Sequence, residues 1–199
     1  MEDHNYKIRK ASFPGKDRLN GTEKPFCRAS HGNKLRQLRR FCNGPRVTTA
    51  QEILDNNVNP GQNVLVISGG MTGVETADYM GEHGKAVTIL EMRPDIALDE
   101  APTPRAFLMP RLADRGIQKI VNATVKKFTE DGVVYEQFGQ EYTIVGFDTI
   151  VLAMGVKPYN PLEEAAGKVC DEVYVVGDAK EAGPANKATE AGLAAALAL

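Results

Sequence analysis

A run of small residues at positions 68–73, Ser-Gly-Gly-Met-Thr-Gly, separates a short apolar segment from a helical pattern. The diphosphate of a dinucleotide is bound by backbone N–H groups aimed at its oxygens and by the positive end of a helix dipole. Gly70 fits the position where phosphate approaches the backbone, and Gly73 fits close contact between helix and strand. Ser68 stands at the first glycine of the G-x-G-x-x-G pattern, where only a small side chain fits. The run therefore predicts a dinucleotide site, and the alternative is a glycine-rich turn in an ordinary α/β domain.

The acidic residue Glu91 follows the next apolar segment, where a carboxylate can accept hydrogen bonds from both hydroxyls of the adenosine ribose. A 2′-phosphate would meet like charge at this position, which favours NADH over NADPH. Arg93 lies two residues further on and could bind a 2′-phosphate instead. The alternative for Glu91 is an exposed strand end. Glu75 lies in the first turn of the helix, where it either offsets the helix dipole or has a functional role.

No other chemistry assembles from the residue types. The sequence has no G-x-S-x-G nucleophile motif, and its three histidines have no evident partners. Tyr6 and Lys10 precede the glycine run, which is the wrong order for the Tyr-xxx-Lys pair of a short-chain dehydrogenase. Cys27, Cys42 and Cys170 form neither a CxxC pair nor a zinc spacing. We therefore expect no catalytic side chain and no metal site.

The apolar periodicity predicts the elements that would position these residues. A strand over 63–67, a helix over about 71–83 and a second strand over 86–90 form a β-α-β unit around the glycine run. The predicted fold class is α/β, a Rossmann-like parallel sheet with an antiparallel β-meander and a C-terminal strand and helix. The other expected elements are a helix over 50–56 capped by Thr49 and Glu52, a helix over 105–114, strands over 117–121, 124–128, 132–136, 141–145, 147–153 and 173–176, and a helix over 185–199.

Charge divides the chain into two regimes. Residues 1–46 contain 12 basic and 4 acidic residues, whereas residues 47–199 contain 12 basic and 22 acidic residues. We expect residues 1–46 to be irregular or partly disordered apart from a short basic helix over 34–41. Their charge favours a solvated tail or contact with the acidic remainder, and nucleic acid is not expected as a partner. Residues 47–155 are expected to form the nucleotide-binding domain, followed by a strand and helix within 156–199.

The hydropathy of the chain gives an expectation for its cellular location. The 199 residues are 25% charged and contain no apolar run of about 18 residues, so no membrane span is expected. The charged N-terminus lacks the apolar stretch of a signal peptide. A reducing, cytoplasmic setting is therefore the expectation.

Four segments, 47–54, 66–77, 148–155 and 173–178, resemble in their order the NAD(P)H-binding domain of flavoproteins with two dinucleotide domains, the pyridine nucleotide-disulfide oxidoreductase superfamily. Residues 47–199 are most similar to the C-terminal region of the NADH:flavin oxidoreductase, 2,4-dienoyl-CoA reductase and trimethylamine dehydrogenase group. The resemblance implies an NAD(P)H-dependent domain in which the nicotinamide passes a hydride to a flavin. The alternative is a non-catalytic or truncated nucleotide-binding module of the same fold.

The resemblance also implies roles for individual residues. Met71 and Glu75 would lie at the nicotinamide end, and Gly177 and Asp178 would bind FAD. We expect the FAD site to be incomplete within these residues, because residues 1–46 contain no glycine motif of the kind that the resemblance implies for FAD. The expected partners are the dinucleotide and a flavin domain or flavoprotein, and a homo-oligomer is left open. The whole predicted cofactor site comprises Ser68, Gly69, Gly70, Met71, Thr72, Gly73, Glu75, Glu91, Met92, Arg93, Ala153, Met154, Gly155, Gly177 and Asp178.

Overall fold

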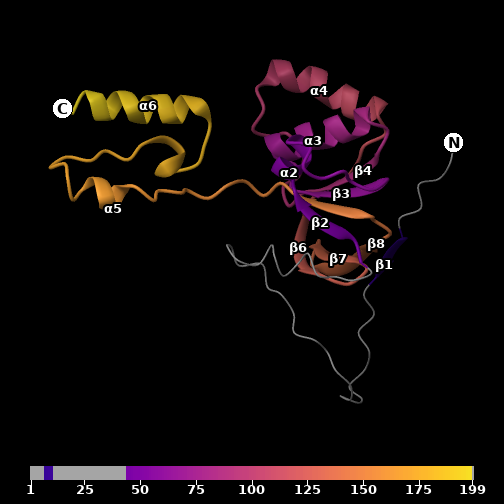
Figure 1. The fold of residues 1–199 in the computed structure, drawn as a ribbon. Helices are drawn as coiled ribbons and strands as arrows, with labels where there is room; N and C mark the ends of the chain where they lie inside the picture. The colour runs from indigo at the N-terminus through magenta and orange to yellow at the C-terminus, as the bar shows by residue number, and fades with distance from the viewer. Residues whose placement is uncertain (1–6, 11–43, 199) are drawn as a thin grey trace, which may run out of the picture. The chain divides into compact units, whose positions relative to one another are not determined.

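The computed structural model describes residues 7–10 and 44–198 of the chain. The chain divides into two compact units, which we call the first unit, ending at Met154, and the second unit, beginning at Gly155. The first unit contains the glycine run and both β-sheets (Figure 1). The domain limits expected from the sequence stay a prediction.

Five parallel strands form the central sheet of the first unit. In spatial order they are β2 (Arg46–Thr49), β9 (Thr149–Leu152), β3 (Asn63–Ile67), β4 (Ala86–Leu90) and β5 (Gln118–Ile120). Strand β3 lies in the middle, and every side chain from Val64 to Ile67 is buried. Both faces of the sheet are covered, which explains why this strand is a continuous apolar run in the sequence.

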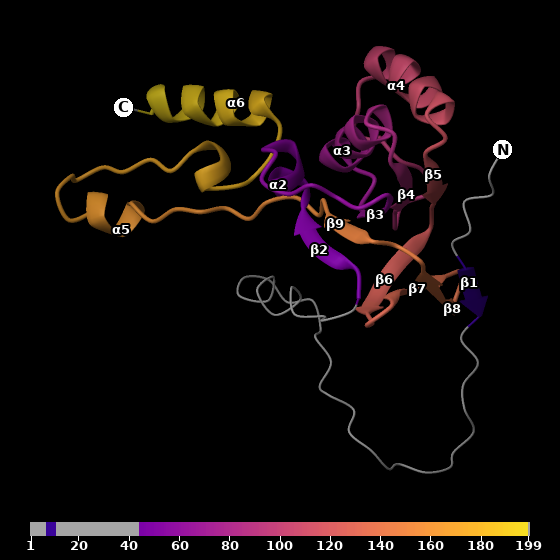
Figure 2. The same cartoon turned by 45° about the vertical axis from the view of Figure 1, so that its right-hand side comes forward.

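Three helices cover one face of the parallel sheet (Figure 2). They are α2 (Ala50–Leu54), α3 (Met71–Glu82) and α4 (Pro102–Asp114). The predicted cap of α2 is confirmed, because Thr49 Oγ1 accepts a hydrogen bond from Glu52 N–H at 3.2 Å and Glu52 Oε2 accepts one from Thr49 N–H at 3.1 Å. Val74 and Ala77 of α3 are fully buried in the core between helices and sheet.

An antiparallel sheet covers the opposite face. In spatial order its strands are β1 (Lys7–Lys10), β8 (Gln140–Val145), β7 (Gly132–Gln137) and β6 (Ala123–Phe128). Tyr135 and Ile144 of this sheet share a buried cluster with Leu65, Ile67 and Leu90 of the parallel sheet. The α/β class with a parallel sheet and a β-meander is therefore confirmed.

Two strands lie where the sequence predicted none. Strand β1 pairs antiparallel with β8, so the expectation that residues 1–46 are irregular is wrong at Lys7–Lys10. The exposed edge of β8 offers unpaired backbone groups that a short segment can satisfy. Strand β2 pairs parallel with β9 at one edge of the parallel sheet. The basic helix predicted over 34–41 lies outside the described residues.

The second unit consists of short elements. They are α5 (Glu163–Ala166), the 3₁₀ helix η1 (Gly177–Ala179) and α6 (Ala185–Ala196), of which α6 confirms the predicted C-terminal helix. The strand predicted over 173–176 is wrong, because no described residue pairs with this segment in a sheet. An apolar run forms a strand only beside a neighbour that satisfies its N–H and C=O groups. Across the described ranges, no helix combines the length and the apolar character needed to span a bilayer.

Candidate dinucleotide site

The glycine run follows β3, the strand at which the order of strands in the parallel sheet reverses. From β3 the chain proceeds to β4 and β5 on one side, whereas β9 and β2 lie on the other side. In open α/β sheets, ligands bind outside the carboxyl ends of the strands at such a switch point. Ser68 follows β3 and Ala153 follows β9 at this edge, and Ala153 N–H donates to the Ile67 carbonyl oxygen at 3.0 Å. The fold therefore brings these two predicted segments together.

Two of the three glycines in the run are required by their neighbours. A Cβ added at Gly73 would lie 2.0 Å from the Ser68 carbonyl oxygen, and one added at Gly69 would lie 2.4 Å from Ile96 Cγ2. Gly70 differs, because the nearest atom to an added Cβ is Ser68 Oγ at 3.8 Å. Contacts within the protein therefore explain Gly69 and Gly73 but leave open space beside Gly70.

The amino end of α3 presents unsatisfied donors beside that space. Gly70 is the N-cap residue, no side chain caps the helix, and its first turn contains no acidic residue. The expectation that Glu75 lies in the first turn is therefore wrong, because the helix begins at Met71. The first intrahelical bond is donated by Val74 N–H to the Gly70 carbonyl oxygen at 3.0 Å. Within residues 7–10 and 44–198, the N–H groups of Met71, Thr72 and Gly73 have no hydrogen-bond partner. These groups and the helix dipole make a site for an anion.

Ser68 has the backbone conformation of a glycine. Its φ is +88°, in the left-handed region that side chains with a Cβ rarely occupy. Its N–H donates to the Leu90 carbonyl oxygen at 2.9 Å, so the adjacent strand holds the residue in place. Ser68 therefore replaces the first glycine of the G-x-G-x-x-G pattern, and its backbone is strained as a result.

Glu91 holds the glycine turn together. Its side chain is 3% exposed, and Oε2 accepts a hydrogen bond from Gly69 N–H at 2.5 Å while Oε1 accepts one from Arg93 N–H at 2.8 Å. The amide of Gly69 is consequently directed at Glu91. The sequence offered no signal for this bond, because the two residues lie 22 positions apart. Among the described residues, Oε2 accepts only the Gly69 N–H and retains a second lone pair. Contact of Glu91 with a ribose hydroxyl stays a prediction.

Arg93 is engaged by a residue that the sequence reasoning missed. Its Nη1 donates to Asp99 Oδ1 and its Nη2 pairs with Asp99 Oδ2, both at 2.9 Å, while Nε lies 3.5 Å from Glu91 Oε1. The hydrogen bond with Asp99, and the charges of Asp99 and Glu91, raise the pKa of Arg93 above its usual value. The same hydrogen bond lowers the pKa of Asp99. The bidentate pair fixes the orientation of the guanidinium.

A second cluster fastens the loop between β4 and α4 to the glycine turn. The Asp95 carboxylate accepts from Lys119 Nζ at 2.6 Å and from Arg105 Nη2 at 2.7 Å. Arg105 Nε also donates to the Ala97 carbonyl oxygen at 3.1 Å, and Ala97 N–H donates to the Gly69 carbonyl oxygen at 2.8 Å. The hydrogen bond from Lys119 is the largest of the effects that lower the pKa of Asp95. The loop is therefore anchored at both its backbone and its side chains.

The remaining predicted residues differ in their exposure and in the unit to which they belong. Ala153 is buried, whereas an exposed group in the first unit consists of Thr72, Glu75, Met92 and Met154. Met71 is half-buried, and Gly155 has a φ of +78°. Gly177 and Asp178 belong to the second unit, where Asp178 Oδ1 accepts from Gly183 N–H at 3.2 Å just before α6. They are not part of the cluster around the glycine turn within the first unit.

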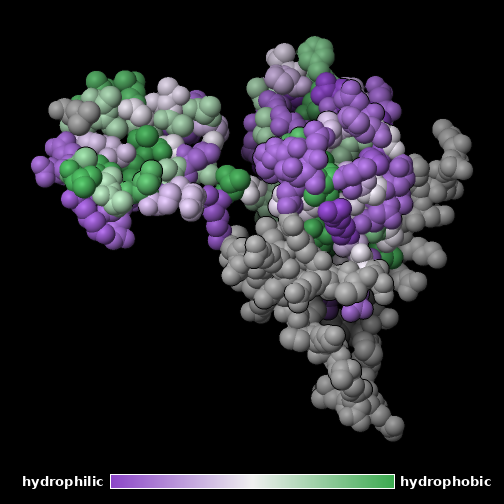
Figure 3. Space-filling model, in the orientation of Figure 1, coloured by the Kyte–Doolittle hydropathy of each residue, from purple (hydrophilic) through white to green (hydrophobic). Residues whose placement is uncertain are grey.

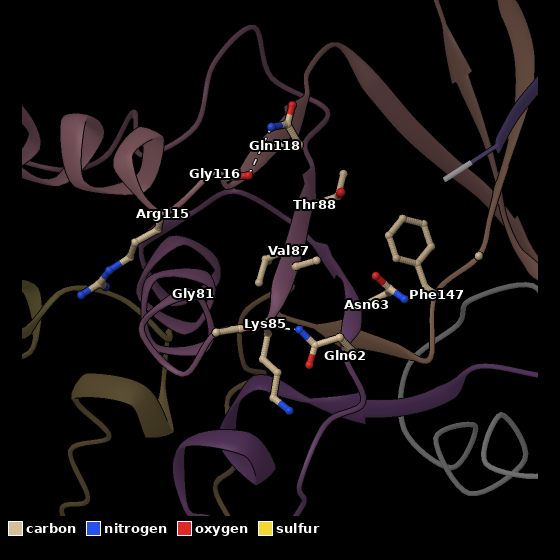
Figure 4. Close-up of a pocket in the computed structure, with 13 residues that line it drawn as sticks. Gln62, Asn63, Gly81, Lys85, Val87, Thr88, Arg115, Gly116, Gln118 and Phe147 are labelled. Atoms are coloured by element: carbon tan, nitrogen blue, oxygen red, sulfur yellow. Dashed lines mark hydrogen bonds between the residues drawn. The ribbon is translucent and has the colours of Figure 1, made fainter. Parts of the chain in front are cut away.

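One hollow of the first unit lies at the opposite edge of the sheet. It encloses about 220 Å³ beside the amino ends of β4 and β5, among residues that include Gln62, Lys85, Thr88 and Arg115 (Figure 4). Arg115 forms ion pairs with two carboxylates of α3. One is with Asp78, and the other is with Glu82 at 3.2 Å. This hollow does not touch the glycine run. Among the described residues, no cluster of three or more His, Cys, Asp or Glu side chains could hold a metal ion.

Comparison with known proteins identifies the family. The family model of pyridine nucleotide-disulphide oxidoreductases matches residues 31–192. The chain belongs to this family. Membership implies the use of NAD(P)H and FAD, and the resemblance inferred from the four sequence segments is confirmed at the family level.

Relatives of known activity are longer than this chain. Bilirubin reductase of Mediterraneibacter gnavus is 32% identical over 156 residues, which cover 78% of this chain and 24% of that protein. NADH oxidase of Thermoanaerobacter brockii is 33% identical over 132 residues, which cover 66% of this chain and 20% of that protein. The chain thus spans about a quarter or less of the length of these relatives.

Solved structures of oxidoreductases have the same fold. A complex of 2-naphthoyl-CoA reductase superposes with a TM-score of 0.66 and 29% identity, covering 73% of this chain and 22% of that chain. Histamine dehydrogenase from Rhizobium sp. 4-9 also has a TM-score of 0.66, over 74% of this chain and 25% of that chain. Its 20% identity supports the fold alone. Together, family and relatives support a domain of a flavin-dependent oxidoreductase.

Proposed function

We propose that this chain is the NAD(P)H-binding part of a flavin-dependent oxidoreductase of the NADH:flavin oxidoreductase group. The observation that carries the proposal is the contrast within the glycine turn. Gly69 and Gly73 are required by neighbouring atoms, whereas Gly70 faces open space next to the uncapped amino end of α3. A glycine that the protein's own contacts do not require is the feature expected where a phosphate approaches the backbone.

Different residues at the carboxyl edge of the sheet would bind different parts of the dinucleotide. The N–H groups of residues 70–73 would bind the diphosphate, and Glu91 would accept a hydrogen bond from the adenosine ribose. Met71, Glu75 and the segment 153–155 would lie at the nicotinamide end. When bound, the nicotinamide supplies the hydride, and the protein binds and orients it. No proton-transfer residue is required for this step.

NADH is the proposed form of the cofactor. Glu91 is buried and bonded to the turn, so its negative charge is held at the place proposed for the ribose. A 2′-phosphate carries up to about two negative charges at neutral pH and would be repelled there. The free energy of binding is therefore expected to be more favourable for NADH than for NADPH.

The second unit does not by itself enclose a flavin. No side chain among residues 155–198 is buried, and one Asp178 oxygen is occupied by Gly183 N–H. The unit exposes large apolar side chains (Figure 3), namely Val156, Tyr159, Leu162, Val169, Leu193 and Leu197. Exposed apolar surface of this kind marks a site of interaction. We therefore propose that a flavin-holding domain, in a longer chain or in a partner, covers this unit and receives the hydride.

A titration with NADH, followed by calorimetry, tests the proposal. We expect saturable binding to the full chain, and we expect Gly70→Ala to weaken it about tenfold, a loss of roughly 1.4 kcal/mol. The midpoint of thermal unfolding should fall by only a few degrees in this variant, because the added Cβ meets nothing closer than 3.8 Å and the remaining cost is that alanine is a poorer N-cap than glycine. Gly192→Ala, at a glycine of α6 with no atom within 4 Å of an added Cβ, is the matched control.

Absence of saturable binding at millimolar NADH would contradict the proposal. A second assay separates it from the alternative of a non-catalytic module, which the lack of buried side chains in residues 155–198 favours for the isolated chain. NADH consumption above background when FAD or FMN is added supports turnover by the chain. Binding without consumption supports the module.

A further inference from the structure

An arginine and two carboxylates meet at the end of β4. Arg93 lies two residues after Glu91, and its own N–H donates to Glu91 Oε1 at 2.8 Å. Its guanidinium therefore extends from the corner where the proposed function places the adenosine ribose. An arginine at that corner is the natural ligand for a 2′-phosphate, because its planar fork matches phosphate geometry.

Asp99 occupies that fork. Two parallel contacts of 2.9 Å join Nη1 and Nη2 of Arg93 to the two carboxylate oxygens of Asp99. The side chain of Arg93 is 33% exposed and that of Asp99 is 63% exposed, so the pair lies at the surface where a ligand can reach it. Both Nη atoms, the ones best placed to grip a phosphate, are thereby turned toward Asp99. With Glu91 counted as well, the corner carries a net negative charge.

The backbone that carries this pair is anchored independently of it. Ala97 N–H is bonded to the Gly69 carbonyl oxygen at 2.8 Å, and Arg105 and Lys119 both bind Asp95. Removing the Asp99 carboxylate would therefore leave the loop in place. The change would be confined to the partner of the Arg93 guanidinium.

We propose that Asp99 is a specificity-determining residue, which holds the Arg93 guanidinium away from a 2′-phosphate and so disfavours NADPH. The inference rests on the proposed function, because it assumes that the dinucleotide binds at the glycine turn. Asp99 acts through Arg93 and is a positioning residue. Its loss is expected to improve NADPH binding specifically, whereas the loss of a merely structural contact would weaken both nucleotides.

The test compares the dissociation constants of NADH and NADPH in matched variants of the full chain. We expect Asp99→Ala to tighten NADPH binding about tenfold and to change NADH binding less than about twofold. Asp114→Ala is the control, since it removes the same charge from an exposed position at the carboxyl end of α4. Arg93→Ala introduced into Asp99→Ala should abolish the gain, because no guanidinium remains to bind the phosphate.

The outcomes separate this inference from the proposed function. If the unaltered chain does not bind NADH, the proposed function fails, and with it the basis of the inference. If NADH binds but Asp99→Ala leaves the ratio of the two dissociation constants unchanged, or weakens both equally, the inference is overturned while the proposed function stands. The isosteric Asp99→Asn replaces Asp99→Ala if thermal unfolding shows that the alanine variant is not folded.

Discussion

Within the glycine turn, the three glycines have different physical roles. Gly73 allows α3 to approach the Ser68 carbonyl oxygen, Gly69 gives room to Ile96, and Gly70 borders open space. The sequence pattern predicts the turn and the glycines but cannot separate these roles, because each depends on atoms far away in the chain. Glu91 is the clearest case: predicted as a ligand of the ribose, it also binds the Gly69 amide from the end of the neighbouring strand.

Ser68→Gly should stabilise the protein. The φ of +88° strains a serine but not a glycine, and relief of this strain outweighs the greater flexibility of glycine in the unfolded chain. We expect the free energy of unfolding, measured with urea, to rise by about 0.5–1 kcal/mol. In contrast, Gly73→Ala should lower it by about 1–3 kcal/mol, because its Cβ would lie 2.0 Å from the Ser68 carbonyl oxygen. A decrease for Ser68→Gly would show that the serine hydroxyl contributes more than the strain costs.

Among the elements, those with strong local signals follow the sequence predictions. The strand–helix–strand unit around the glycine run and the three meander strands appear where their apolar patterns place them. The short strands β1 and β2 were missed, because only pairing with β8 and β9 makes them strands. The strand predicted over 173–176 does not form, because no strand among the described residues pairs with this apolar segment. Pairing partners are a property of the fold and cannot be read from a window of sequence.

The loop between β4 and α4 is expected to make stability depend on acidity. Bonds from Lys119 and Arg105 lower the pKa of Asp95 below its usual 3.8 in the folded protein, so the unfolded chain takes up the proton first as the pH falls. Stability from Asp95 is thus complete above about pH 5 and is lost as the pH falls through 3.8 and below. Urea unfolding from pH 7 to pH 3 measures this loss.

Asp95→Asn should lower the free energy of unfolding at pH 7. It should also reduce the fall in this free energy between pH 5 and pH 3. Asp114→Asn, at an exposed position, is the matched control and should keep the slope of the unaltered chain. An Asp95→Asn variant whose slope equals that of the control would show that the cluster does not stabilise the loop.

The two units of the chain differ in how they are stabilised. The first unit has buried clusters on both faces of its parallel sheet, whereas no side chain of residues 155–198 is buried. Burial of apolar side chains is the main source of stability in folded proteins. The second unit is therefore expected to gain most of its stability from a partner.

Hydrogen exchange of backbone amides should reveal this difference in the full chain. Amides of β3 and β4 should exchange slowest, and those of α6 should exchange close to the rate of an unstructured peptide. A flavin-holding partner should slow exchange in α6 without changing exchange in β3. Equal protection of α6 and α3 in the chain alone would contradict this expectation, and would point to a second copy of the chain if the measured mass is that of a dimer.

The turn after β3 is proposed to hold the diphosphate of NADH. Backbone amide chemical shifts measured by NMR during an NADH titration test it most directly. We predict the largest shift changes at the amides of Gly70, Met71, Thr72 and Gly73. The last three N–H groups have no partner among the described residues, and that of Gly70 has only a 3.5 Å contact with Ser68 Oγ. Changes confined to the hollow at the opposite edge of the sheet, around Gln62 and Gly116, or no changes at saturating NADH, would contradict the claim.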